Sequence, residues 1–362
     1  MSDLLTENLK LSHRLEGLVN GMSDDLEEIL SGSLDEVKRR ILELAAKAEQ
    51  TDSVIRRKTY LEKLRLEIAR VQREVWADIG KKIQTEAVDL AGAAPEIAEA
   101  VLEKGMGVKI TLGVPKLSKR GVVAWFESSQ VDGLFFNQWL EKLEKNCVDR
   151  IIKETRRSMI LHEPYSEAGK RIEQALEVSK RSARGLARNA VFQAYNWAEH
   201  EFYMENAERL QGLRFVAELD RHTCPLCAEL DGKVFPLGEE AIPPLHWSCR
   251  CRLAPVFKWE DPNKPYGERP ARMETEPRTV HHRDGTTSTA YREYDAKVIP
   301  AKVSYSEWMN AMVKSEDAED VAFAKEALGP TRFKLVESGK LKIESLYYGG
   351  KLRTIEELEE LI

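Results

Sequence analysis

Four of the five cysteines in the chain lie within 28 residues of one another, and this clustering constrains the fold more than any other feature. Cys224 and Cys227 have C-x2-C spacing, which lets two thiolates approach one ion from a single turn. A second group, His246, Cys249 and Cys251, begins 19 residues after Cys227. Soft sulfur ligands with one imidazole favour zinc in a tetrahedral shell. We therefore predict a structural Zn2+ site held by four of these five side chains.

Other interpretations of the cysteines remain open at this point. They are a disulfide pair, reduced cysteines in a core, and a catalytic zinc with one position open to water. A catalytic zinc usually needs a carboxylate base, and Glu229 and Asp231 are close in sequence. Asp231-Gly232, however, is typical of a hairpin turn between Leu230 and Val234-Phe235. We therefore favour a closed site in a module over residues 220–256, which is too small to fold without metal.

Composition excludes several classes of protein. The chain has 362 residues, of which 42% are hydrophobic and 32% charged, so it can bury a core and favours helices with solvated faces. Its 55 Lys and Arg against 61 Asp and Glu give a net charge of -6, which argues against a general nucleic-acid binder. No apolar run is long enough for a membrane span. The first residues lack the pattern of a secretory signal, and five cysteines are too few for a secreted disulfide scaffold.

Residues 1–105 are expected to form a region of long helices. Ser33-Leu34-Asp35-Glu36 has the pattern of a capping box, with Ser33 as the N-cap of one helix. A longer helix is expected from about Ser53, because apolar residues follow at helical spacing. They are Leu61, Leu64, Ile68, Val71, Val75, Ile79 and Ile83. Such a stripe requires a partner surface, either another helix of this chain or a neighbouring subunit.

Residues 106–133 differ in character, because glycines punctuate short β-branched runs. We expect a small β or irregular insert here, with strands at Val108-Lys109-Ile110-Thr111 and Val122-Val123. Helical periodicity returns in residues 134–257, the region that holds the cysteine cluster. Cys147 lies on the apolar side of this pattern and is expected to be a small buried hydrophobe.

The C-terminal third divides into two parts. Residues 258–302 are rich in proline and charge and have few apolar side chains, which predicts an extended linker. Residues 303–362 regain helical patterning and predict a compact helical end piece, with a helix stop at Gly329-Pro330 and an N-cap at Thr354. The expected fold class is therefore mainly α, with a small β-containing zinc-knuckle module, an α+β arrangement.

A helix expected from about Ser166 to Gln211 carries a basic stripe. Lys180, Arg181, Arg184 and Arg188 recur along it at helical spacing. One interpretation is an ordinary solvated face. The other is a contact with DNA phosphates or with an acidic partner.

The run D-R-H-T-C-P-L-C-A-E-L-D-G-K-V-F starts at Asp220, and P-P-L-H-W-S-C-R-C follows at residues 243–251. Together these runs resemble the phage head morphogenesis family, the Mu F-like minor head proteins. The helix ending Leu186-Ala187-Arg188-Asn189 matches the family layout, although Asn189-Ala190 departs from the usual acidic or threonine-glutamate continuation. The resemblance covers roughly residues 140–260 well and residues 303–362 moderately.

The resemblance implies a minor structural protein of a tailed phage, present in few copies at the portal vertex or in the head interior. Its role would be head assembly or genome delivery. Its partners would be the portal protein and other head proteins, with packaged DNA as a further contact. Its location would be the virion head, and the host cytoplasm during assembly.

The alternative function is a zinc-dependent nucleic-acid-binding protein or a nuclease that acts on phage DNA. An HNH-type nuclease needs a metal-bound catalytic histidine next to an asparagine or a second histidine. His222, beside Cys224, is the candidate, and the sequence offers it no matching partner. Ser-His-Asp, P-loop and G-x-G-x-x-G patterns are absent too, so we expect the protein not to be an enzyme.

Overall fold

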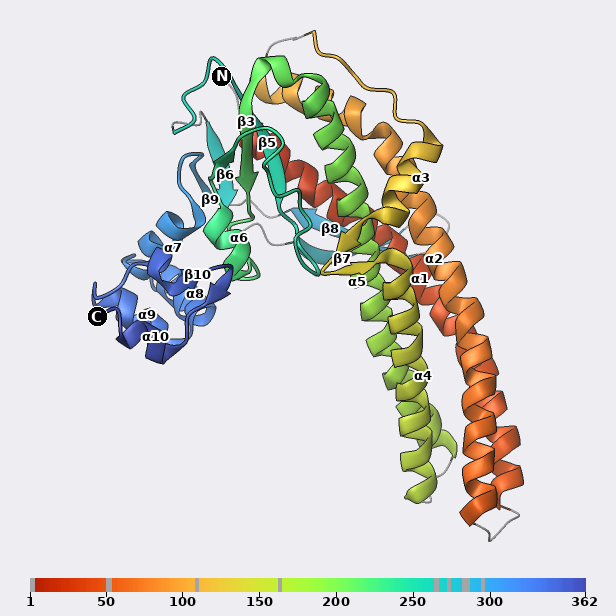
Figure 1. Cartoon of the computed structure of the whole chain (residues 1–362). Coiled ribbons are helices and arrows are strands. Elements are labelled where there is room, and N and C mark those ends of the chain that lie inside the picture. Colours follow the sequence, from red (N-terminus) through yellow and green to blue (C-terminus); the bar gives the residue numbers. More distant parts are fainter. Residues whose placement is uncertain are drawn as a thin grey trace.

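The computed structural model describes residues 4–49, 54–107, 111–161, 165–263, 267–271, 275–281, 287–293 and 297–362. Long helices form an arm, small antiparallel sheets lie near one end of it, and a unit of short helices lies beyond the sheets (Figure 1). The predicted fold class, mainly α with small β parts, is thus confirmed. No described helix is both long and apolar enough to cross a membrane.

Four helices build the arm. They are α1 (Leu4–Glu49), α2 (Val54–Met106), α4 (Phe136–Ile160) and α5 (Tyr165–Glu205). Their apolar stripes face one another, so Ile68 and Ile79 of the stripe predicted in the second helix are fully buried within the chain. Cys147 is 0% exposed, as predicted, and its thiol donates to the side-chain oxygen of Gln72 over 3.3 Å.

The predicted helix start at Ser33 is wrong, because α1 runs through this position without a break. The Ser33 hydroxyl donates to the carbonyl of Leu30 over 2.7 Å and accepts from the Gln72 amide of α2 over 3.2 Å. A serine can bond back in this way inside a helix whose position is set by packing. Glu36 accepts from Arg39 and Arg40 instead of reaching back to Ser33.

The insert at residues 106–133 contains a helix where a strand was predicted. Val122 belongs to α3 (Lys119–Ser128) and is buried with Phe126 in the main core. These two side chains, four positions apart, share one face of the helix, and their packing in the core overrides the β-branched preference of Val122. The strands of the insert are β1 (Gln130–Val131) and β2 (Leu134–Phe135), which form a hairpin. The other predicted strand lies mostly outside the described residues, because residues 108–110 are not among them.

A three-stranded antiparallel sheet in the order β4-β3-β5 forms the base of the predicted metal module. Its elements follow α5 and a short 3-10 turn (Ala207–Arg209) and are β3 (Leu210–Val216), α6 (Pro225–Leu230), β4 (Val234–Phe235) and β5 (Arg252–Phe257). The predicted turn at Asp231-Gly232 is present, and Gly232 has a φ of +82°, which favours glycine. The predicted hairpin partner is wrong, because Leu230 lies in α6 and β4 pairs with β3.

Residues 258–302, expected to be an extended linker, contain two antiparallel strand pairs in their described parts. β6 (Glu268–Ala271) pairs with β9 (Lys297–Pro300), and β7 (Thr275–His281) pairs with β8 (Thr287–Glu293). Arg269 is only 2% exposed, because it reaches the Asp231 carboxylate of the module. Backbone pairing and a buried ion pair therefore order a stretch whose composition indicated neither.

The C-terminal unit has its own core. Its elements are α7 (Tyr305–Val313), α8 (Ala318–Leu328), α9 (Pro330–Glu337), a 3-10 turn (Ile343–Leu346), β10 (Tyr347–Tyr348), β11 (Lys351–Leu352) and α10 (Ile355–Glu359). Met309 and Leu346 are 0% exposed at its centre. As predicted, α8 ends at Gly329 and Thr354 caps α10, in a capping box with Glu357.

Candidate metal centre

The fold brings the two halves of the Cys/His cluster together. The Nε2 atom of His246 lies 3.1 Å from the Sγ of Cys224 and 3.3 Å from the Sγ of Cys227. The Sγ atoms of Cys227 and Cys249 are 3.8 Å apart. Two sulfurs that each lie ~2.3 Å from a tetrahedral zinc are separated by about 3.8 Å. The separation of the Cys227 and Cys249 sulfurs therefore fits two ligands of one tetrahedral ion.

The first half of the cluster is formed by the start of α6. Pro225 occupies the first turn, and Cys224 caps the helix by accepting a hydrogen bond from the Cys227 amide over 3.4 Å. Hydrogen bonds from Cys227, and then from His246, lower the pKa of Cys224 to about 4, although the side chain is half-buried. A thiolate is the form that binds metal, so the helix start prepares Cys224 as a ligand.

His246 presents one specific nitrogen to the sulfurs. Its Nδ1 atom lies 2.8 Å from the carbonyl oxygen of Trp247, which can only accept, so Nδ1 carries the proton. Nε2 therefore faces the sulfurs and is the nitrogen that would bind a metal once its proton is released, as in metal-bound histidines that are oriented by a backbone carbonyl. Hydrogen bonding to Cys224 and then to Cys249 raises the pKa of His246 to about 11. The sulfurs thus create a place that attracts positive charge.

The remaining cysteines are buried behind the first group. Cys249 and Cys251 are 1% and 4% exposed, and their Sγ atoms form a compact set with Cys227. Cys227 therefore belongs to both groups of three that could hold an ion, one with Cys224 and His246 and one with the two later cysteines. All five residues singled out from the sequence meet in one place, and the cluster could hold a metal ion.

Two asparagines of α5 hold the loop that carries the second half of the cluster. The Asn189 side-chain oxygen accepts from the Ser248 amide over 2.8 Å. The Asn196 amide donates to the carbonyls of Pro243, over 3.1 Å, and Cys251, over 3.2 Å. Sequence reasoning missed both residues. Polar amides seven positions apart among the apolar residues of a helix were the available signal, since buried amides need partners.

A glycine of the same helix admits an aromatic side chain of the loop. A Cβ atom built on Gly185 would lie 2.7 Å from Cζ2 of Trp247, closer than atoms can approach. The Trp247 ring also packs against the Trp139 ring of α4, with a centroid separation of 4.4 Å. Gly185 therefore allows Trp247, the neighbour of His246, to lie directly on the helix.

The N-terminal part of α1 packs on the other side of this loop. The Asn8 amide donates to the Leu253 carbonyl over 3.2 Å, and the Ser12 hydroxyl donates to the Arg250 carbonyl over 3.3 Å. The Arg250 guanidinium bonds to the carboxylates of Glu218 and Asp220. Arg250, between the last two cysteines, and Leu253, after them, are thus held by hydrogen bonds to their backbone carbonyls, and Arg250 also by ion pairs of its side chain.

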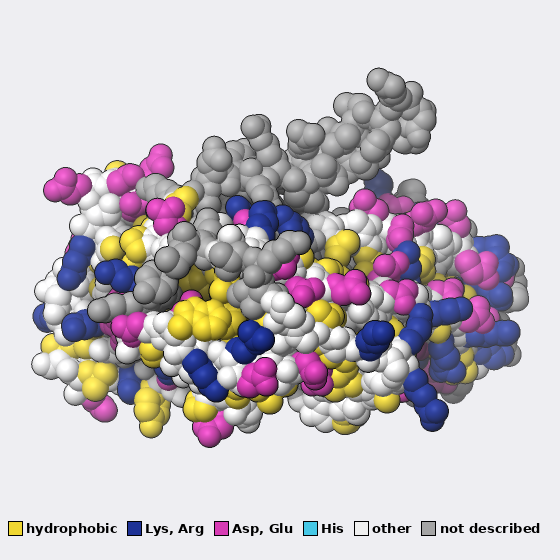
Figure 2. All heavy atoms as spheres, turned by 90° about the horizontal axis from the view of Figure 1, so that it is seen from above, with side chains coloured by type: hydrophobic (Ala, Val, Ile, Leu, Met, Phe, Trp, Pro, Cys, Tyr) yellow, Lys and Arg dark blue, Asp and Glu magenta, His cyan; other side chains and the backbone are white. Residues whose placement is uncertain are grey.

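Three of the four side chains of the predicted basic stripe bond to other residues of the chain. Arg188 pairs with Glu16 of α1 over 2.5 Å, and Arg184 donates to the Asn20 side chain of the same helix. Lys180 pairs with Glu177 over 2.6 Å, whereas Arg181 is exposed. The spacing was therefore right for a helix face, and two of the four cations meet α1. Acidic and basic side chains are interspersed on the face drawn in Figure 2.

The two carboxylates near the cluster serve as structural acceptors. Asp231 accepts from the Ala217 amide over 2.8 Å, the Tyr305 amide over 2.7 Å and the Arg269 guanidinium over 2.9 Å. Glu229 accepts from the Gly350 amide in the turn of the β10–β11 hairpin over 2.9 Å. Both residues therefore attach the C-terminal half of the chain to the module.

Comparison with known proteins gives one match. Residues 149–254 match a family model described as Phage Mu protein F like protein. The matched segment begins in α4, includes all of α5 and ends in β5, so it contains all five residues of the cluster. Neither the curated proteins nor the solved structures contain a significant match to the chain.

Proposed function

We propose that this chain, which residues 149–254 identify as a member of the phage Mu protein F-like family, is a minor structural protein of a tailed-phage head. The family indicates a phage head morphogenesis protein with other head proteins as partners. The proposal adds that the chain binds at or near the portal and acts in head assembly or genome delivery. Its main support is that the family match coincides with one structural unit, the helix α5 and the Cys/His module that it holds.

We propose that the cluster binds Zn2+ through Cys224, Cys227, His246 and Cys249. These four give three sulfurs and one nitrogen. Cys224, Cys227 and His246 form one group whose donor atoms lie within 4.8 Å of one another, and the Cys249 sulfur lies 3.8 Å from that of Cys227, as for two thiolates on one tetrahedral zinc. Cys251 is then a buried neighbour of the shell and not a ligand. When bound, zinc would link α6 to the loop before β5 and stabilise a module with little core of its own.

We propose a structural and not a catalytic role for this site. A hydrolytic zinc needs an open coordination position and a carboxylate that is free to act as a base. Glu229 and Asp231, two acids close in sequence to the ligands, are both used as hydrogen-bond acceptors for backbone amides. Four protein ligands leave the shell closed, as in structural zinc sites.

Co-expression with the portal protein of the same phage tests the proposed location. A tagged portal protein should retain the full chain through affinity purification and gel filtration. The control is an unrelated tagged oligomer expressed with the same chain, which should retain none. If both proteins are folded and never purify together, the portal proposal is overturned.

The alternative of a zinc-dependent nucleic-acid-binding protein or nuclease has less support. Arg184 and Arg188 of the basic stripe bond to α1, which leaves few stripe cations for phosphates. We expect no cleavage of DNA with added magnesium or manganese, and no gel shift of DNA by the stripe at low salt. Cleavage, or a shift that Arg181→Glu abolishes, would favour the alternative.

A further inference from the structure

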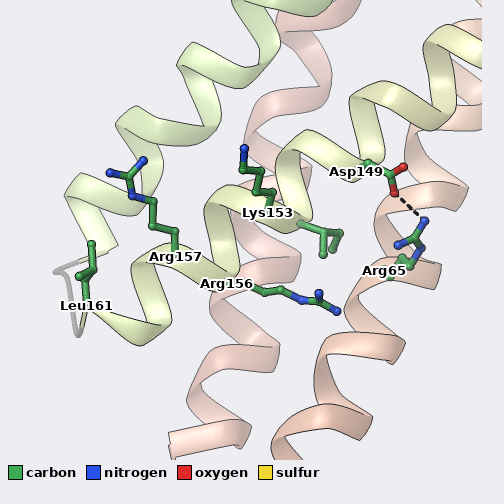
Figure 3. A pocket seen from close by; sticks show the side chains of 7 residues that line it. Arg65, Asp149, Lys153, Arg156, Arg157 and Leu161 are labelled. Atoms are coloured by element: carbon green, nitrogen blue, oxygen red, sulfur yellow. Dashed lines mark hydrogen bonds and ion pairs between the residues drawn. The ribbon is translucent and has the colours of Figure 1, made fainter.

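The far end of the helical arm has a hollow lined by cations. It has a volume of about 680 Å³ and lies between α2 and the last turns of α4. Figure 3 shows Arg65 on one side and Lys153, Arg156 and Arg157 along α4. The hollow lies outside the metal module, and none of its lining residues was a candidate site residue from the sequence.

Positive charge in this hollow is not balanced by the residues that the structure describes. Four cations line it against one carboxylate, Asp149, which pairs with Arg65 over 2.5 Å. Among the described residues, Lys153, Arg156 and Arg157 have no acidic partner within ion-pair distance. Since the whole chain carries a net charge of -6, this local excess stands out from its surroundings. Like charges on adjacent turns repel, and an anionic partner would relieve that repulsion.

The hollow also has an apolar part. Ile152 lines it and is 3% exposed, and Leu161 lines it with 53% of its side chain exposed. Phosphates of a nucleic acid would use the cations and leave the exposed Leu161 in water. An acidic peptide segment with aliphatic side chains matches both features.

Such a segment exists in the chain itself. After Arg353 the sequence has four glutamates and no Lys or Arg. Glu359 and Glu360 are exposed and their carboxylates have no partner among the described residues, and Leu361 and Ile362 follow with 50% and 54% exposure. Leu358, at 0% exposure, anchors α10 to the C-terminal unit, and these four residues form the exposed last turn at its end.

In Figure 1 the C-terminus lies far from the last turns of α4, whose residues line the hollow. One copy of the chain therefore cannot join its own two surfaces. We propose that residues 359–362 of one copy dock in the arm-tip hollow of a second copy. The two glutamates would face Arg156 and Arg157, and Leu361 and Ile362 would cover the exposed Leu161. Two different surfaces meet in this contact, so it is heterologous and can continue from copy to copy.

Sedimentation velocity of the full chain tests this docking. The wild type should show a weight-average mass that rises above the monomer value of 41.3 kDa with concentration, and the rise should weaken with added salt. The double variant Arg156→Glu with Arg157→Glu should remain a monomer. The double variant Glu359→Lys with Glu360→Lys should also remain a monomer, because it alters the other half of the same contact.

Mixing the two double variants gives the decisive result. One retains an intact tail and the other an intact hollow, so the mixture should associate although neither variant does so alone. The reversed hollow and the reversed tail are themselves complementary in charge, so association can continue beyond pairs. Lys145→Glu on α4 and Glu337→Lys on α9 change charge by the same amount per residue at exposed positions elsewhere, and should associate like the wild type.

Three outcomes would overturn the proposal. They are a wild type that stays monomeric up to about 100 μM at low salt, variants that associate unchanged, and a mixture that forms no pairs. If the wild type is monomeric and Arg156→Glu with Arg157→Glu abolishes a DNA gel shift, the hollow binds nucleic acid instead. If a different acidic protein is lost from co-purification in that variant, the hollow serves that partner and not a second copy.

Discussion

The side-chain amide of Asn196 donates to the carbonyl oxygen of Cys251 over 3.2 Å, across 55 positions of sequence. The same amide group also reaches Pro243, at the start of the loop that carries His246. One helix residue therefore fixes both ends of the segment that completes the Cys/His cluster. The cluster depends on α5 as much as on its own cysteines.

Replacing Asn196 by alanine should loosen this loop while leaving every metal ligand in place. Two buried hydrogen bonds are lost, which should lower the free energy of unfolding by about 1–3 kcal/mol. Metal affinity should fall by about 10- to 100-fold, as for other residues that support ligands from behind. Urea unfolding and competition with a chelator measure the two effects. Asn310→Ala in the C-terminal unit is the control and should leave metal affinity unchanged.

The proposed ligand set predicts different results for two neighbouring cysteines. Cys227→Ser should lose the metal and destabilise the module, because the Cys227 sulfur is central to the cluster. Cys251→Ser should keep about one zinc per chain. Elemental analysis with a free-thiol count measures both, and Cys147→Ser controls for replacement of a buried thiol. Full zinc content in Cys227→Ser would contradict the assignment, and so would complete loss in Cys251→Ser.

Removing the carboxylate charge of Asp231 should separate the C-terminal unit from the module. Asp231→Asn leaves the Arg269 guanidinium buried without its counter-charge, and breaking such a pair costs about 3–5 kcal/mol. Hydrogen exchange should then quicken across residues 305–362 more than in the arm. Glu307→Gln, at the exposed end of the same connection, is expected to change exchange little. Uniform quickening in the arm as well would show that Asp231 supports the whole fold and not this junction.

Buried Glu199 should contribute a measurable pH dependence. Burial raises the pKa of Glu199 above its ordinary value of 4.5, although the Arg252 charge beside it acts in the opposite direction. Between 4.5 and the raised pKa the folded state holds a proton that the unfolded state has released, so stability falls as pH rises through this range. Glu199→Gln should lower stability overall and remove this part of the slope.

The measurement is urea unfolding from pH 4.5 upward, compared between the variant and the wild type at each pH. Glu205→Gln, on an exposed position of the same helix, should retain the wild-type slope. A difference between Glu199→Gln and wild type that does not change with pH would show that Glu199 ionises as it does in water.

The cysteine cluster could be predicted from sequence because metal ligands have strict spacing. Cys224 and Cys227 lie on one turn, and the second group follows at a fixed interval, so residue type and position together limit the geometry. The C-terminal helices were predictable for a similar reason. Gly329 and Thr354 act locally, and a local cap needs no knowledge of the rest of the fold.

The predictions for Ser33 and Val122 were wrong because packing against distant parts of the chain decides the local structure there. Ser33 has a good capping pattern, yet its hydroxyl is occupied by Leu30 and by Gln72 of another helix. Val122 has a strand preference, yet it is buried in a helix against the arm. Gln72 is 39 positions from Ser33, and the core against which Val122 packs comes from other helices, so neither influence can be read from a local pattern.

Polar contacts between residues far apart in the sequence could not be predicted either. Asn189 was noted as a departure from the family pattern, and the structure shows it bonding to Ser248 beside the ligands. Arg269 lay in a stretch with the composition of a linker, and it is buried against Asp231. A single sequence shows that such residues are polar, but not which partner makes their burial favourable.

Helix α1 bonds to the ligand loop through Asn8 and Ser12, and it is also one of the four long helices of the arm. It has 46 residues without a break, which corresponds to a rod about 69 Å long. A rod clamped at one end behaves as a lever. A force on the distant tip of α1 would therefore exert a torque on the loop that carries the cysteines. Mechanical force on the arm would in this way affect how well the cluster retains a metal.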